Sequence, residues 1–186
     1  MNLTIQIDSR EKVRAIKKIL ADFDRYNVKY YISKLWTGDY MSLDNPRVII
    51  DRKQNLSEIC SNVCQSHDRF RNELIRAQAN GIKLIILIEH SSQIKCIDDV
   101  TKWENPRRKK RIWVPDQCLT ASGEEYWEAA HYETVETKAM SGETLSKIMR
   151  TMEEKYGCQF LFCDKIHTGR KIIEILGGDG VDSRRN

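Results

Sequence analysis

The chain has 186 residues and a formal net charge of +4 at pH 7, and 40% of its residues are hydrophobic. This length suffices for one compact domain with its own core and is short for two. The mild positive charge permits a nucleic acid partner without requiring one.

No segment has the pattern of a secretory leader or of a membrane span. Alternating apolar residues, beginning at Leu3, start at once, without a charged and apolar leader before them. The longest apolar run, 84–88, is far shorter than the roughly 20 residues that a bilayer requires. We therefore expect no membrane partner and an intracellular protein, cytoplasmic or associated with the nucleoid. The cysteines are expected to be reduced thiols rather than zinc ligands, because no CxxC pair is present.

Hydrophobic periodicity predicts alternating strands and helices in the first half of the chain. The predicted elements are a strand at 3–8, a helix at 11–23, a strand at 28–35, a hairpin over 36–53, helices at 55–63 and 66–80, and a strand at 82–89. Asn55 and Ser66 are the expected N-caps of the two later helices. The strand at 82–89 is almost continuously apolar, which is typical of a strand buried on both faces in a parallel sheet.

Residues 90–140 interrupt this pattern, and we expect an insertion or an excursion from the sheet there. Positions 107–111 are five consecutive cations, whereas 112–137 contain six acidic residues and no lysine or arginine. The regular pattern then resumes with a helix from Ser141 or Thr144, a strand at 158–163 and a helix at 165–176. We expect the whole chain, 1–186, to form one α/β domain in which helices flank a central mixed sheet in three layers.

The end of the predicted hairpin carries a candidate hydrolytic site. Strand alternation directs Asp51 and Lys53 to one face and Arg52 to the other. Asp39, on the other arm of the hairpin, can supply a second carboxylate, and such oxygen ligands favour Mg²⁺ or Mn²⁺ over zinc. The cation would activate a bound water, while the lysine would orient or deprotonate that water or offset charge on a phosphate. Each short motif alone also matches an ordinary turn or a solvated strand end.

Three motifs in one order resemble the XPF-type nuclease domain of the PD-(D/E)xK class. They are Asp8-Ser9-Arg10-Glu11, Gly38-Asp39-Tyr40 and Ile50-Asp51-Arg52-Lys53, against the family patterns V-D-x-R-E, G-D-Y and V-E-R-K. The similarity covers roughly residues 3–90 and, more weakly, 141–176. It implies a restriction-endonuclease-like fold and a metal-dependent DNA endonuclease. It further implies a preference for flaps, forks or branches, in repair, recombination or phage DNA processing.

The resemblance also implies a role for each matching residue. The expected catalytic residues are Asp39, Asp51 and Lys53. The expected ligands of Mg²⁺ or Mn²⁺ are Asp8, Glu11, Asp39 and Asp51. The residues expected to contact DNA phosphates or to brace the site are Arg10, Arg52 and Arg69. Aspartate stands at position 51 where the family usually has glutamate, and nucleases of this class accept either.

The basic run and the end of the chain leave alternatives open. The run, with Trp103 and Trp113 beside it, can bind DNA, or it can be a solvated loop folded against the acidic stretch. Its residues are Arg107, Arg108, Lys109, Lys110 and Arg111. We expect no helix-hairpin-helix domain of the family after Leu176, and a homodimer or a partner protein stays open. Two other functions remain: a non-catalytic DNA-binding module of the same fold, and a restriction-type enzyme that cuts intact duplex.

Overall fold

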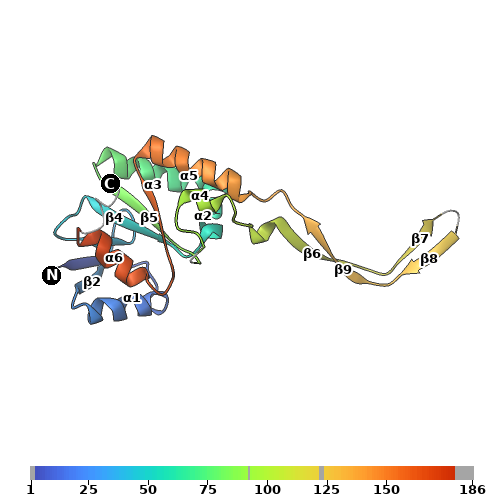
Figure 1. Cartoon of the computed structure of the whole chain (residues 1–186), viewed down its shortest axis with the longest axis horizontal. Coiled ribbons are helices and arrows are strands. Elements are labelled where there is room, and N and C mark those ends of the chain that lie inside the picture. Colours follow the sequence, from blue (N-terminus) through green and yellow to red (C-terminus); the bar gives the residue numbers. More distant parts are fainter. Residues whose placement is uncertain (1–2, 92, 122–123, 179–186) are drawn as a thin grey trace.

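The predicted strands of the body assemble into one six-stranded sheet, seen in the computed structural model in Figure 1. The structure describes residues 3–91, 93–121 and 124–178. In the order in which they lie across the sheet, the strands are β10 (Gln159–Cys163), β5 (Lys83–Glu89), β4 (Val48–Lys53), β3 (Tyr40–Ser42), β1 (Thr4–Asp8) and β2 (Lys29–Ser33). β3 is antiparallel to both neighbours, and the other pairs are parallel. The sheet is therefore mixed, with the predicted hairpin at its centre.

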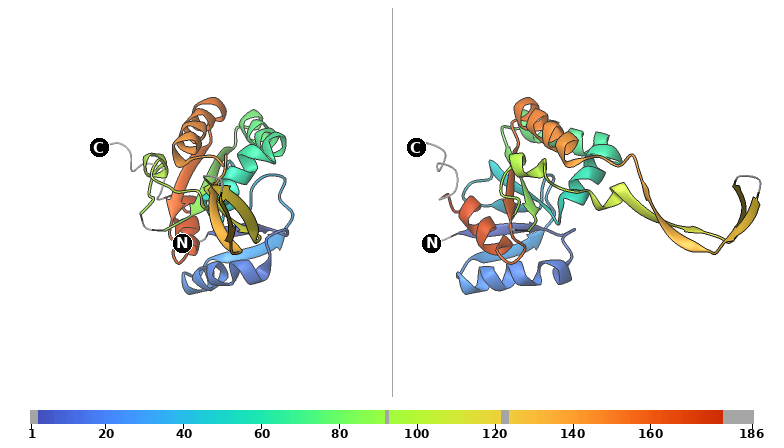
Figure 2. Two further views of the ribbon diagram at one scale, coloured as in Figure 1. Left: turned by 90° about the vertical axis from the view of Figure 1, so that its right-hand side faces the viewer. Right: turned by 45° about the vertical axis from the view of Figure 1, so that its right-hand side comes forward.

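Helices cover both faces of this sheet (Figure 2). One face packs against α1 (Val13–Arg25) and α6 (Thr168–Leu176), and the other against α2 (Leu56–Cys64), α3 (His67–Ala79) and α5 (Gly142–Tyr156), with the short α4 (Ile97–Val100) beside α5. Each face has its own core because strand side chains alternate: Ile50 and Leu87 belong to the α1–α6 core, and Ile49 and Ile86 to the other. The predicted three-layer α/β fold with a mixed sheet is confirmed.

Local sequence signals set several helix ends. Asn55 accepts a hydrogen bond from the Glu58 N–H at 2.9 Å and so caps α2, and Ser141 caps α5 in the same way. Gly157 ends α5 with a φ of 65°, a left-handed conformation that costs other residues more. Ser66 is the N-cap residue of α3, as predicted, but its side chain makes no capping hydrogen bond. No helix in the described part of the chain is long and apolar enough to cross a bilayer.

A β-ribbon, which we call the arm (residues 106–121 and 124–137), projects from the body between α4 and α5 (Figures 1 and 2). It consists of a 3₁₀ turn (Pro106–Arg108) and the strands β6 (Lys109–Val114), β7 (Gln117–Ala121), β8 (Glu124–Glu128) and β9 (His131–Glu136). β6 pairs antiparallel with β9, and β7 with β8. The last three cations of the basic run therefore lie on a strand and not in a loop.

Candidate active site

The β3–β4 hairpin brings Asp39 and Asp51 together. The register pairs Tyr40 with Ile50, so Asp39, which immediately precedes β3, lies level with Asp51. The Asp39 N–H donates to the Ile50 carbonyl at 2.7 Å, and Asp39 Oδ2 accepts from the Arg52 N–H at 2.8 Å. The backbone of β4 thus holds the Asp39 carboxylate beside that of Asp51.

Gly38 permits this close approach of the two strands. Its φ is 64°, and an added Cβ would lie 2.5 Å from Ile49 Cγ2 and 2.8 Å from the Ile50 carbonyl oxygen. Its N–H donates to Glu73 Oε1 at 3.0 Å, which joins the turn to α3. The glycine in the Gly-Asp motif is therefore required both by backbone conformation and by the space available.

Lys53 lies on the same face of β4 as Asp51, as strand alternation predicts. Its Nζ is 2.8 Å from Asp51 Oδ1 and 2.7 Å from Oδ2, and 5.8 Å from the centre of the Phe70 ring on α3. Burial lowers the pKa of Lys53, but the negative charges of Asp51 and Asp39 more than offset this effect, so its pKa is raised. The side chain is therefore an ammonium at neutral pH.

The two carboxylates carry more negative charge than Lys53 balances. Burial raises the pKa of Asp39 well above its usual range, and the charge of Asp51 raises it further. Asp51 is buried, and its Oδ2 accepts no hydrogen bond of good geometry from any described residue, although Lys53 Nζ lies 2.7 Å away. An additional cation beside these oxygens would therefore be stabilised.

The chemistry of the site suits a divalent metal ion held by two carboxylates and water. Among residues 3–91, 93–121 and 124–178, no cluster of three or more His, Cys, Asp or Glu side chains has metal-binding geometry. Mg²⁺ commonly uses only one or two carboxylates and keeps several waters, which leaves positions for a phosphate oxygen. Asp39 and Asp51 match that requirement through their oxygen chemistry and the orphaned Asp51 Oδ2.

Asp8, one of the expected metal ligands, is engaged with other groups. It is fully buried, and its two oxygens accept four hydrogen bonds, from the backbone and guanidinium of Arg10 and from the Leu35 N–H. Burial favours a raised pKa, but these donors outweigh it and hold the pKa of Asp8 below its usual range. Four hydrogen bonds occupy the usual acceptor capacity of one carboxylate. The structure thus places Asp8 in an ion pair with Arg10.

Arg52 lies on the opposite face of β4, in a buried ionic network. Its side chain is 3% exposed; Nη1 donates to Glu11 Oε2 at 2.9 Å and Nε to Glu89 Oε1 at 2.8 Å. The Thr168 hydroxyl donates to the same Glu89 oxygen at 2.9 Å, and the Tyr40 hydroxyl to Glu11. Of the two roles expected for Arg52, this geometry fits bracing, because the guanidinium does not reach the surface.

Sequence reasoning missed Glu89. A signal was present, because Glu89 is a carboxylate at the end of an otherwise apolar strand that is parallel to β4. A charged group in such a place is rarely left without a partner. The pattern gave no indication that the partner is Arg52, 37 residues away.

The other expected DNA contacts lie at the surface. Arg69 is exposed on the first turn of α3, one residue before Phe70, whose ring approaches Lys53. The Arg10 side chain is 56% exposed while its guanidinium is bound to Asp8. A cavity of about 510 Å³ opens beyond the ends of β4, β5 and β10. It is lined by Gln54, Asn55, Glu89, His90, Ser91, Asp164, Lys165 and Ile166.

Comparison with known proteins connects this fold and site to one family. A family model described as the ERCC4 domain matches residues 7–175. The structure of XPF from Aeropyrum pernix aligns with a TM-score of 0.58 and 16% identity, covering 93% of this chain and 63% of that chain. XPF from Aeropyrum pernix in complex with DNA aligns with a TM-score of 0.56 and 15% identity, covering 95% and 64%. No curated protein sequence matches the chain.

These comparisons confirm the resemblance that the three motifs indicated. At such low identity the aligned structures establish the fold alone. The chain spans less than two thirds of the length of the XPF chains that it matches.

Proposed function

Since the chain belongs to the ERCC4 domain family, we propose that it is a metal-dependent DNA endonuclease whose reacting residues are Asp39, Asp51 and Lys53. The observation that carries this proposal is the pair of facing carboxylates with one ammonium in contact with Asp51. Such a set suits the hydrolysis of a phosphodiester, because a cation can offset the repulsion between carboxylates and phosphate.

In this proposal Asp39 and Asp51 hold Mg²⁺ or Mn²⁺, which when bound lowers the pKa of water and stabilises the leaving oxygen. Lys53 acts as a fixed positive charge that positions the water or the phosphate. The negative charges of Asp51 and Asp39 raise the pKa of Lys53, which favours the charged form that this role requires. The charge of Glu11 also raises the pKa of Asp39, but Glu11 accepts hydrogen bonds from Arg52 and Tyr40 and would hold Arg52 in place. Asp8 has no free acceptor position and would orient Arg10.

DNA is the proposed substrate class. One of the matched XPF structures is a complex with DNA, which supports this choice. Arg69, exposed on the helix that carries Phe70, would contact a phosphate, and Arg10 would do so from its pair with Asp8. A preference for flaps, forks or branches follows from the family and is part of the proposal.

The test is cleavage of labelled duplex, single-stranded, flap and fork DNA with Mg²⁺ or Mn²⁺ against EDTA. Asp51→Asn should lower the cleavage rate by roughly 10²–10⁴-fold, because a metal ligand contributes several kcal/mol to the transition state. Asp98→Asn, an exposed aspartate on α4, is the matched control and should cut at the normal rate.

Three outcomes would contradict this function. Cleavage that persists in EDTA, or in the Asp51→Asn variant, would show that hydrolysis does not depend on a metal ion held by Asp51. DNA that binds but stays intact with either metal would indicate the non-catalytic module of the same fold. Cleavage of intact duplex at one fixed sequence would indicate a restriction-type enzyme.

A further inference from the structure

The proximal half of the arm presents an exposed face that combines cations with aromatic rings. In an antiparallel pair, directly opposite residues share a face. Trp113 lies opposite Tyr132, and Arg111 opposite Thr134. Strand alternation adds Lys109 and, opposite it, Glu136 to the same face. Two cations, two aromatic rings and one carboxylate at the root therefore lie along one side of β6 and β9.

The aromatic rings on this face are available to a ligand. Trp113 is 56% exposed and Tyr132 is 59% exposed, and their ring centres are 4.9 Å apart. The Arg111 guanidinium lies 4.6 Å from the Tyr132 ring. A two-stranded ribbon by itself is only marginally stable in water. Large aromatic rings that stay exposed on such a ribbon are typical of a surface that binds a partner. A ligand that covers the rings would stabilise the arm.

The cations on the arm are also available. Within the described residues, no carboxylate lies within salt-bridge distance of the basic run 107–111. β6 does pair through its backbone with the acidic β9, and Lys109 faces Glu136. The acidic stretch therefore folds against the basic run without forming ion pairs with it.

The root of the arm is fixed to α2, the helix that follows the strand carrying Asp51 and Lys53. Arg107 Nη1 donates to Ser61 Oγ at 3.2 Å, and Ser61 belongs to α2, which begins three residues after Lys53. Asn105 is buried; its side chain donates to the Met140 carbonyl at 2.8 Å and accepts from the Arg107 N–H. The basic run is thus held in place relative to the helix that follows the catalytic strand.

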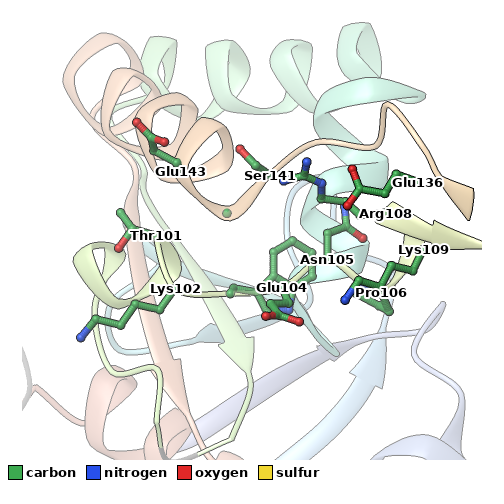
Figure 3. A pocket seen from close by; sticks show the side chains of 12 residues that line it. Thr101, Lys102, Glu104, Asn105, Pro106, Arg108, Lys109, Glu136, Ser141 and Glu143 are labelled. Carbon is green, nitrogen blue, oxygen red and sulfur yellow. The ribbon is translucent and has the colours of Figure 1, made fainter.

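A cavity at this root adds room for a chain beside the basic run. It has a volume of about 650 Å³ and lies between the arm and the start of α5. In Figure 3, Lys109 and Glu136 lie toward the arm, Glu143 lies at the other end of the cavity, and the Arg108 side chain extends toward Ser141. Both acidic and basic side chains line this cavity, so its charge alone does not favour an anionic ligand. The nature of the ligand is therefore inferred from the aromatic face.

We propose that the face formed by Lys109, Arg111, Trp113 and Tyr132 binds single-stranded DNA next to the cleavage site. The cations would hold phosphates, and unpaired bases would stack on the two rings. Intact duplex fits less well, because its bases are already stacked and cannot cover the rings. β6 is roughly 20 Å long, and the acidic half of the arm beyond it would repel phosphates, so the contact ends near Trp113.

This inference rests on the proposed function for the nature of the ligand, but its test does not require cleavage. Binding of a labelled oligothymidine is measured by fluorescence anisotropy in EDTA, in the full chain carrying Asp51→Asn. Trp113→Ala should weaken binding about 5- to 150-fold, which is the effect of losing one stacked base. Trp127→Ala is the matched control, since Trp127 is 75% exposed on β8 among acidic residues. It should bind as tightly as the parent.

Two further variants separate stacking from charge and from misfolding. Trp113→Phe keeps a ring and should restore most of the affinity. The double change Lys109→Ser and Arg111→Ser should reduce the slope of log affinity against log salt concentration by about 1.4, because each phosphate contact with a single strand contributes about 0.7.

Equal binding by Trp113→Ala and Trp127→Ala would overturn the inference, as would competition by intact duplex at the same strength as single strands. The two proposals can fail separately. Cleavage by the wild type combined with equal binding by the two tryptophan variants refutes only the arm site. Binding of single strands that requires Trp113, in a protein that cuts no DNA, refutes only the nuclease.

Discussion

Replacing Arg52 by methionine should destabilise the protein strongly. The change keeps most of the side-chain volume but leaves Glu89, which is 3% exposed, without its positive partner. One oxygen of Glu89 already lacks a hydrogen bond, and only the Thr168 hydroxyl would remain on the other. Removing one member of a buried ion pair costs about 3–5 kcal/mol, because the remaining charge stays out of water. For a chain of this size the midpoint of thermal unfolding should fall by roughly 6–20 °C.

The assay is urea and thermal unfolding followed by circular dichroism at neutral pH. Arg150→Met is the matched control, because Arg150 pairs with Asp98 at the surface, where the two side chains are 53% and 76% exposed. Such surface pairs contribute less than about 1 kcal/mol. Adding Glu89→Gln to Arg52→Met should recover part of the loss, since the uncompensated charge is then removed. Equal stability of Arg52→Met and Arg150→Met would refute the bracing role and leave Arg52 as a phosphate contact.

Two further predictions concern the carboxylate pair and the turn that holds it. Because the pKa of Asp39 is raised in the folded protein, its protonated form favours folding. This contribution to the stability of the fold is fully present below about pH 4 and is lost as the pH rises through the raised pKa. Asp39→Asn should therefore raise the unfolding midpoint in EDTA at pH 7 while abolishing cleavage; an unchanged dependence of the midpoint on pH would contradict this. Gly38→Ala should lower both the free energy of unfolding and the cleavage rate, because the added methyl group would clash with Ile49 and Ile50. Gly157 has a similar φ but open space around it, so Gly157→Ala should lower the free energy of unfolding by only about 1–2 kcal/mol and leave cleavage unchanged. Urea unfolding and the DNA cleavage assay measure the two effects.

The body of the fold could be predicted because its signals are local. The run 82–89 is apolar on both faces, and in the structure β5 is covered on both faces and parallel to both neighbours. Asp51 and Lys53 could be placed on one face, and Arg52 on the other, from strand alternation alone. Gly38 marked the turn, although the contact with Ile49 that requires a glycine there appears only in three dimensions.

The arm could not be predicted in the same way, because it has no core. Hydrophobic periodicity reports burial, and most of the side chains described on β6 and β9 are exposed. Their pairing joins Lys109 to Glu136 across a long stretch of chain, and no local signal fixes that register. Asp8 shows a related limit, because no local signal indicates that its carboxylate accepts a hydrogen bond from the N–H of Leu35, 27 residues away.

The two faces of β4 connect the ionic network to the candidate site. Asp51 and Lys53 project to one face and Arg52 to the other, so a shift of this strand by one residue would exchange the two environments. The bonds from Arg52 to Glu11 and Glu89 tie the end of β4 to the start of α1 and the end of β5, and they oppose such a shift. We therefore expect Arg52→Met to lower cleavage even where the protein remains folded, because the register that aligns Asp51 with Asp39 would be held less firmly.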